Sequence, residues 1–121
     1  MDVASLKAQI QSNQLNPFYI FTGEEWYVQR LYMKQIAKRF NDRLNSVDDA
    51  KTLFQQLSKR SVLSQNAVYV LRDDVEIIKN PEIIDTLKSV IAENIVILVL
   101  SSFDKRTKIY KTYKDTFIET S

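Results

Sequence analysis

The side chains best suited to chemistry in this sequence are carboxylates that stand where apolar segments end. Asp73 and Asp74 follow the apolar run 68–71, and Glu24 follows the apolar run 18–21. An acid at the end of a buried strand orients Mg²⁺ and water in phosphoryl-transfer sites. Asp is also common where turns begin, for purely local reasons. The three acids therefore leave open a magnesium-dependent phosphoryl-transfer or nuclease-like enzyme. We favour ordinary turns, because no phosphate-binding loop precedes the acids.

The turn Thr22-Gly23-Glu24-Glu25 lies where a phosphate loop would hold a nucleotide. Gly23 is the only glycine of the chain, and no Gly-Lys-Ser/Thr follows it. The free amides of a helix N-terminus favour an anion, but here Glu24 and Glu25 supply that charge. Thr22 and Glu25 also have the spacing of a capping box. We therefore expect a self-capped helix start that binds no nucleotide, and we expect no cofactor.

Composition excludes several classes of function. The 121-residue chain contains no cysteine and no histidine, which removes disulfides, thiol catalysis, histidine bases and nearly every zinc site. The N-terminus lacks the basic and apolar regions of a signal peptide, and the longest apolar run is too short to span a bilayer. We expect a non-catalytic, cytoplasmic protein with no membrane partner.

A basic segment near the C-terminus is a candidate for contact with nucleic acid. Its cations are Lys105, Arg106, Lys108 and Lys111. Such a cluster could neutralise phosphates, although a charged outer helix face is the commoner explanation. The tyrosines of this segment fall at core spacing, so we do not expect them to stack on bases. A basic DNA-binding module remains an alternative function.

The pair Val62-Leu63 is unusual because it lies inside an otherwise polar and basic loop, 58–66. Either one side chain packs inward as the preceding helix ends, or the pair is an exposed apolar anchor for a partner's pocket. Anchors of that kind dominate the energy of many interfaces. The residues alone leave both interpretations open.

The elements that position these residues follow from apolar periodicity and from start signals. We expect strands at 18–21, near 43–44, at 68–71, 95–100 and 117–120, with 95–100 central because it is the most apolar. We expect helices after Asp2, after the Thr22-x-x-Glu25 box as far as Phe40, after Ser46-x-x-Asp49, after Asn80-Pro81-Glu82, and over 103–114 with Ser101-Ser102 as the cap. Within the second helix, Trp26, Met33, Ala37 and Phe40 should line the core face, broadened by Val28, Leu31 and Ile36. The alternation predicts one α/β domain, a three-layer sandwich with a mostly parallel sheet and right-handed crossovers.

The ordered set of motifs resembles the N-terminal domain of the delta subunit of bacterial DNA polymerase III, part of the clamp loader. The matching segments are the aromatic strand, Gly-Glu-Glu turn and aromatic helix start at 18–28, the loop and strand at 61–71, and the apolar strand at 95–100 followed by Asp104-Lys105-Arg106 and Lys111. This resemblance covers the chain from Phe18 onward.

The resemblance implies a P-loop-NTPase-like (AAA+-like) topology that lacks a phosphate loop and binds no ATP. It implies that Val62 and Leu63 insert into a pocket on the sliding clamp and help to open it during DNA replication. The other implied partners are further clamp-loader subunits and, indirectly, DNA. Family members carry a lid domain and a helical collar after this domain, so we expect residues 1–121 to be the N-terminal domain alone.

Overall fold

The computed structural model describes residues 1–59, 65–102 and 106–120. Five strands form one sheet, in which every neighbouring pair is parallel, in the order β2-β3-β4-β1-β5. The strands are β1 (Phe18–Thr22), β2 (Leu44–Val47), β3 (Val68–Arg72), β4 (Ile95–Leu100) and β5 (Phe117–Glu119). The helices are α1 (Val3–Ser12), α2 (Trp26–Ala37), α3 (Ala50–Ser58), α4 (Val75–Lys79), α5 (Ile83–Val90) and α6 (Lys108–Tyr113), with 3₁₀ turns at Lys38–Phe40 and Lys114–Thr116. The expected α/β class and P-loop-NTPase-like topology are confirmed.

Strand β4 lies at the centre of the sheet, as its composition predicts. All six of its residues are buried, and it pairs with β3 on one side and β1 on the other. Strand β1 is buried along its whole length as well. Both faces of the sheet are covered by helices, which is why these two strands are apolar runs without alternation.

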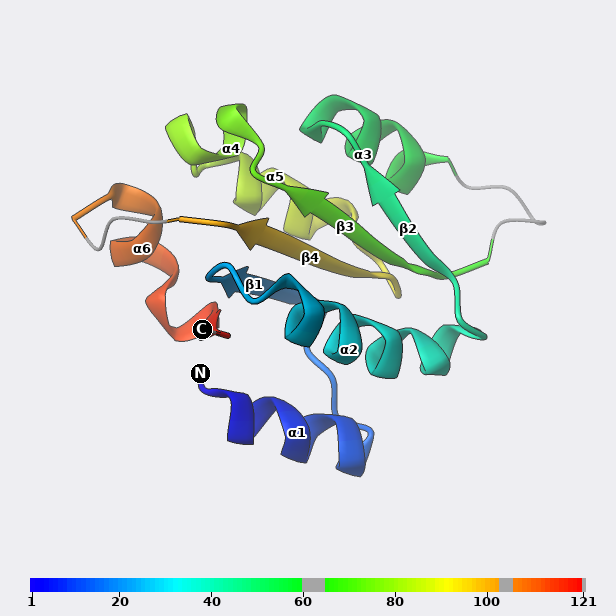
Figure 1. Ribbon diagram of the computed structural model, residues 1–121. Helices are drawn as coiled ribbons and strands as arrows, with labels where there is room; N and C mark the ends of the chain where they lie inside the picture. Colours follow the sequence, from blue (N-terminus) through cyan, green and yellow to red (C-terminus); the bar gives the residue numbers. More distant parts are fainter. Residues whose placement is uncertain (60–64, 103–105, 121) are drawn as a thin grey trace.

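Strand order explains which helices cover which face (Figure 1). The chain moves across the sheet in one direction from β2 to β3, β4 and β5, and in the opposite direction from β1 to β2. Right-handed crossovers then put α2 on one face and the later helices on the other. The buried residues form one cluster on each face of the sheet and match this arrangement. Helices α1 and α2 contribute to one cluster, and α3, α4, α5 and α6 contribute to the other.

Two predicted core positions of α2 are wrong. Trp26 is 57% exposed and Leu31 is 46% exposed, whereas Met33, Ile36 and Ala37 are buried. Trp26 is the first residue of the helix, and the preceding strand ends at Thr22. Trp26 is therefore in the first turn of α2, beyond the end of β1, whereas Leu31 lies on the side of α2 opposite to the core residues Met33 and Ile36.

The helix starts match the sequence only in part. Asp2 caps α1, with its carboxylate accepting from Ser5 N at 2.8 Å, and Asp49 caps α3 in the same way, accepting from Thr52 N at 2.7 Å. The predicted start at Ser46 is wrong, because Ser46 belongs to β2 and pairs with Val70. Pairing with β3 extends β2 past Ser46, so α3 begins after Asp49 instead.

The last two helices, α5 and α6, begin later than their predicted starts at Asn80 and at Ser101-Ser102. Helix α4 was not expected; Asp74 caps it, and Asn80 ends it rather than beginning the next helix. Helix α5 begins after Glu82 instead. Helix α6 begins at Lys108 after Thr107, so the predicted cap at Ser101-Ser102 is also wrong. None of the helices in the described ranges is long and apolar enough to cross a membrane.

Candidate functional site

Two opposite edges of the sheet hold the candidate residues. At the edge formed by the carboxyl ends of the strands, here called the carboxyl edge, the turns after β1 and β3 are joined to β4. Gly23 N donates to Leu100 O at 3.2 Å, and Asp73 N donates to Val99 O at 2.7 Å. Gly23 has φ 110°, a conformation that a side chain would oppose, and Asp73 has φ 50°. Ligands of open parallel sheets bind at this edge, so its free groups decide what it can hold.

The predicted capping box at Thr22 and Glu25 is wrong. Thr22 ends β1 and is fully buried, and its hydroxyl donates to Ile118 O at 3.4 Å. Glu25 holds the N-cap position of α2 but makes no side-chain cap bond. Pairing of β1 with both β4 and β5 keeps Thr22 in the sheet, and so removes it from the helix end.

Gln29 ties the start of α2 to the turn at Gly23 and to Thr120, and sequence reasoning missed it. Its side chain is fully buried, and Nε2 donates to Gly23 O at 3.0 Å and to Thr120 Oγ1 at 2.9 Å. Thr120 in turn donates to Thr22 O at 2.9 Å. Gln29 Oε1 is buried and has no hydrogen-bond partner within the described residues. The only available signal was a polar residue on the otherwise apolar inner face of α2.

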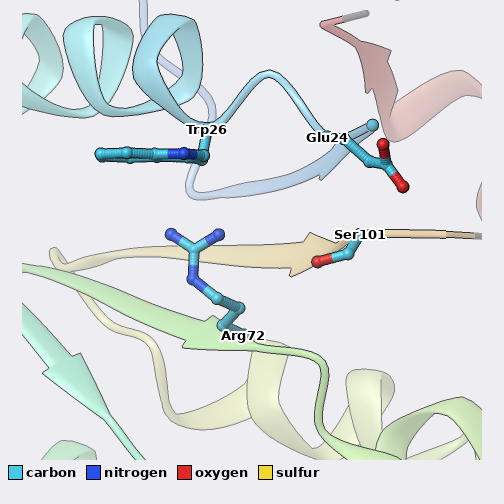
Figure 2. A pocket seen from close by; sticks show the side chains of 5 residues that line it. Glu24, Trp26, Arg72 and Ser101 are labelled. Atoms are coloured by element: carbon cyan, nitrogen blue, oxygen red, sulfur yellow. The ribbon is translucent and has the colours of Figure 1, made fainter.

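A pocket of about 420 Å³ opens at the carboxyl edge. Its lining residues are Gly23, Glu24, Trp26, Arg72 and Ser101. Figure 2 shows the Arg72 side chain extending from the end of β3 toward the indole of Trp26, with Glu24 on the other side of the opening. Among the described residues, the lining set pairs one cation with one carboxylate and includes no lysine, a combination that does not fit a triphosphate.

Asp73 and Asp74 are both occupied by structural bonds. The Asp73 carboxylate accepts from Ser101 N at 2.8 Å and from Ser101 Oγ at 2.6 Å. Asp74 accepts from Ile77 N at 3.1 Å as the cap of α4. In the ranges 1–59, 65–102 and 106–120, no group of three acidic, histidine or cysteine side chains could hold a metal ion. These geometries are those of turn residues.

The basic segment lies partly in the described residues. Arg106, Lys108 and Lys111 are exposed, whereas Lys105 lies outside the described residues. Ile109 is buried, as its spacing predicts. The three cations thus sit on the outer side of the α6 region and do not meet the carboxyl-edge pocket.

Tyr113, at the end of α6, is tied to α5. Its hydroxyl donates to Asp85 Oδ1 at 2.9 Å, and Lys88 Nζ lies 5.2 Å from its ring centroid and 5.4 Å from that of Phe18. Burial, followed by the hydrogen bond and negative charge of Asp85, raises the pKa of Tyr113 to about 12. Because Phe18 begins β1, this cluster lies at the opposite edge of the sheet, here called the amino edge.

Val62 and Leu63 lie outside the described residues, and the ends of their loop join the amino edge. The segment that follows the loop is held on several sides. Ala67 N donates to Asn94 Oδ1 at 2.9 Å, and Arg43 Nε donates to Asn66 O at 2.8 Å. Asn66 Nδ2 donates to Glu93 Oε2 at 3.2 Å. The return of the loop to β3 is thus fixed to the turns before β2 and β4.

The five-strand parallel sheet in the order β2-β3-β4-β1-β5, with helices on both faces, defines a P-loop-like α/β fold. Among solved structures, the chain is similar to the Bacillus subtilis DNA clamp loader delta protein (YqeN), with a TM-score of 0.62 and 17% sequence identity. The similarity covers 98% of this chain and 42% of that one, so this chain spans about two fifths of its length. No protein-family model and no curated protein matches the sequence. At this identity the likeness shows the shared fold, which agrees with the resemblance expected from the motifs.

Proposed function

We propose that this protein is a non-catalytic, clamp-loader delta-type module that binds the sliding clamp and helps to open it for loading on DNA. The observation that carries the proposal is the likeness to a clamp loader delta protein over nearly the whole chain. The occupied carboxylates and unsuitable pocket of the carboxyl edge favour a role in binding over catalysis. The implied partners are the clamp, other loader subunits and, through them, DNA, in the cytoplasm.

The proposed clamp contact is the apolar pair Val62 and Leu63. Its support is the sequence pattern together with the surroundings of the loop ends. Leu57, in the last turn of α3, is buried, and Ala67 is buried where β3 begins. Core packing and hydrogen bonds thus hold both flanks of the loop. A loop with fixed ends loses less entropy on binding than a free peptide of the same sequence.

The test is the affinity for the sliding clamp, measured by surface plasmon resonance with the full chain. Leu63→Ala and Val62→Ala should each weaken binding, and the stronger effect should be about 30-fold or more, the scale of an interface hot spot. Val75→Ala is the matched control, because Val75 is an aliphatic side chain, 56% exposed, at the carboxyl edge. Unchanged affinity in both loop variants would refute the site, and absence of any clamp binding would refute the function.

A second test concerns nucleotide. We expect calorimetric titration with ATP and Mg²⁺ to give no binding heat, because Glu24 lines the pocket and no Gly-Lys-Ser/Thr follows Gly23 in the turn after β1. A micromolar complex would contradict this part of the proposal. Metal-dependent thermal stabilisation without nucleotide would instead favour the enzyme alternative at Asp73 and Asp74.

A further inference from the structure

The outer side of α2 and of the 3₁₀ turn that follows it carries a row of exposed aromatic and basic side chains. Trp26, Arg30, Lys34 and Lys38 follow one another at four-residue intervals, about 6 Å apart along the axis. Tyr27 and Leu31 lie beside this row. We call these six exposed residues, 26, 27, 30, 31, 34 and 38, the aromatic–basic face.

The exposed aromatics of this face are unusual, and folding does not explain them. Tyr27 is 72% exposed and Trp26 is 57% exposed, while the opposite side of the same helix supplies Tyr32, Met33 and Ile36 to the core. Large aromatic side chains at such exposure commonly serve recognition. The core side of α2 is complete without them.

The charge of this face has one sign. The segment 26–40 contains four cations and no acid. One of the four, Arg39, donates to Ile10 O and so braces α1. The remaining three, Arg30, Lys34 and Lys38, are exposed on the row. A partner of this face should therefore be anionic.

We propose that the aromatic–basic face binds single-stranded nucleic acid. Exposed bases stack on Trp26 and Tyr27, while Arg30, Lys34 and Lys38 neutralise successive phosphates, which is the combination that single-strand sites use. Paired bases would not offer their faces to the rings, so the aromatics favour a single strand over a duplex. The large exposed apolar side chains of this face are Trp26, Tyr27 and Leu31, all in the first half of α2, which is shorter than the apolar face of a helix that lies on a membrane.

The charges around the aromatic–basic face differ between its two ends. Glu24 and Glu25 precede Trp26, so phosphates are repelled at that end and attracted toward Lys34 and Lys38. The carboxyl-edge pocket opens against Trp26, which leaves room for a base to reach the indole. The face lies on the α1 and α2 layer, on the other side of the sheet from Lys108 and Lys111. This proposal does not depend on clamp binding by Val62 and Leu63.

The test is fluorescence anisotropy of the full chain with labelled oligothymidylate of about 12 nucleotides, within the usual range of single-strand sites. Trp26→Ala should weaken binding at least fivefold, as expected for one lost stacking partner, and Trp26→Phe should restore part of it. Arg30→Gln with Lys34→Gln should lower the slope of log affinity against log salt by about 1.4, at roughly 0.7 for each phosphate contact. Lys51→Gln, an exposed cation of α3, is the matched control.

Each outcome decides the proposal. Salt-sensitive binding that falls in the Trp26 and Arg30/Lys34 variants, but not in Lys51→Gln, supports it. No binding, or binding that these variants leave unchanged, overturns it. Equal or tighter binding of a blunt duplex overturns the stacking role, and binding to phosphatidylserine-containing vesicles in place of oligothymidylate overturns the choice of partner. All of the altered side chains are exposed, so thermal unfolding should match that of the parent protein.

Discussion

The two edges of the sheet use their polar groups differently. At the carboxyl edge, Asp73 bonds to Ser101 and the buried Gln29 bonds to the carbonyl of Gly23, so both side chains serve the fold itself. At the amino edge, Asn94 and Arg43 instead hold the root of a long loop. In this fold the carboxyl edge is the usual place for a ligand. The comparison shows that the amino edge, where hydrogen bonds hold the flank of a loop, is a candidate binding region. The carboxyl edge, where related folds bind nucleotide, is not the only place to look for function.

The amino edge should respond most strongly to the loss of Asn94. Asn94→Ala leaves the buried Ala67 N–H without its acceptor and removes the bond from Asn94 Nδ2 to Ile91 O. We expect the free energy of unfolding to fall by about 1–3 kcal/mol, measured by urea denaturation. Clamp affinity should fall as well, because the loop root loosens. An unchanged urea midpoint would show that Asn94 does not hold this edge.

The carboxyl edge should lose stability without losing clamp binding. Asp73→Ala removes two acceptor bonds to Ser101 and places a non-glycine residue without a polar side chain at positive φ. We expect a loss of about 1–2 kcal/mol in unfolding free energy. Asp73→Asn, which keeps an acceptor and tolerates this conformation, should recover part of it. A large fall in clamp affinity for Asp73→Ala, with the fold intact, would break the division between the edges.

Tyr113, which donates to Asp85 near the amino edge, should make the free energy of unfolding fall at alkaline pH. The phenol pKa of Tyr113 is raised from 10 to about 12, so folding favours the neutral form. Its contribution is complete below pH 10 and is lost as pH rises toward 12. Tyr113→Phe should be less stable by about 1 kcal/mol at neutral pH and should show a smaller decline between pH 10 and 12, measured by denaturation at each pH. An identical alkaline decline in both proteins would exclude Tyr113 as its source.

The smallest effect should come from Glu24. It lines the carboxyl-edge pocket but is exposed. Glu24→Gln should change the free energy of unfolding by less than about 0.5 kcal/mol and leave clamp affinity unchanged. Chemical denaturation and the clamp assay check this together. Weaker clamp binding in this variant would place part of the interface at the carboxyl edge.

Continuous apolar runs made the strands predictable. The segments 18–21 and 95–100 could only be buried on both faces, and both are. Asp2 was recognisable as a cap because a carboxylate that accepts from an amide three residues later is a local interaction. Asp49 caps α3 by the same interaction, but the sequence pattern placed the cap at Ser46. Local signals failed where tertiary pairing competed with them. Ser46 has the spacing of a cap, but pairing with β3 keeps it in a strand.

The candidate site was less predictable than the fold, because it depends on contacts between distant segments. Thr22 bonds to Ile118, and Asp73 bonds to Ser101. No local pattern contains either pair. Periodicity predicted that Trp26 is buried, because it assigns each residue of a helix to a side. It does not show how far the helix extends past the end of the sheet. The exposure of Trp26 could therefore be recognised only once the structure showed that β1 ends at Thr22.

The position of β1 has a consequence for how the chain folds during synthesis. Phe18 pairs with Val96, and Ile20 pairs with Phe117, so β1 needs partners that are synthesised much later. At ~5–20 residues per second, the roughly 80 residues between Phe18 and Val96 take about 4–16 s to synthesise. Through that interval the apolar β1 has neither of its neighbours. The sheet can therefore close around β1 only after both β4 and β5 have left the ribosome.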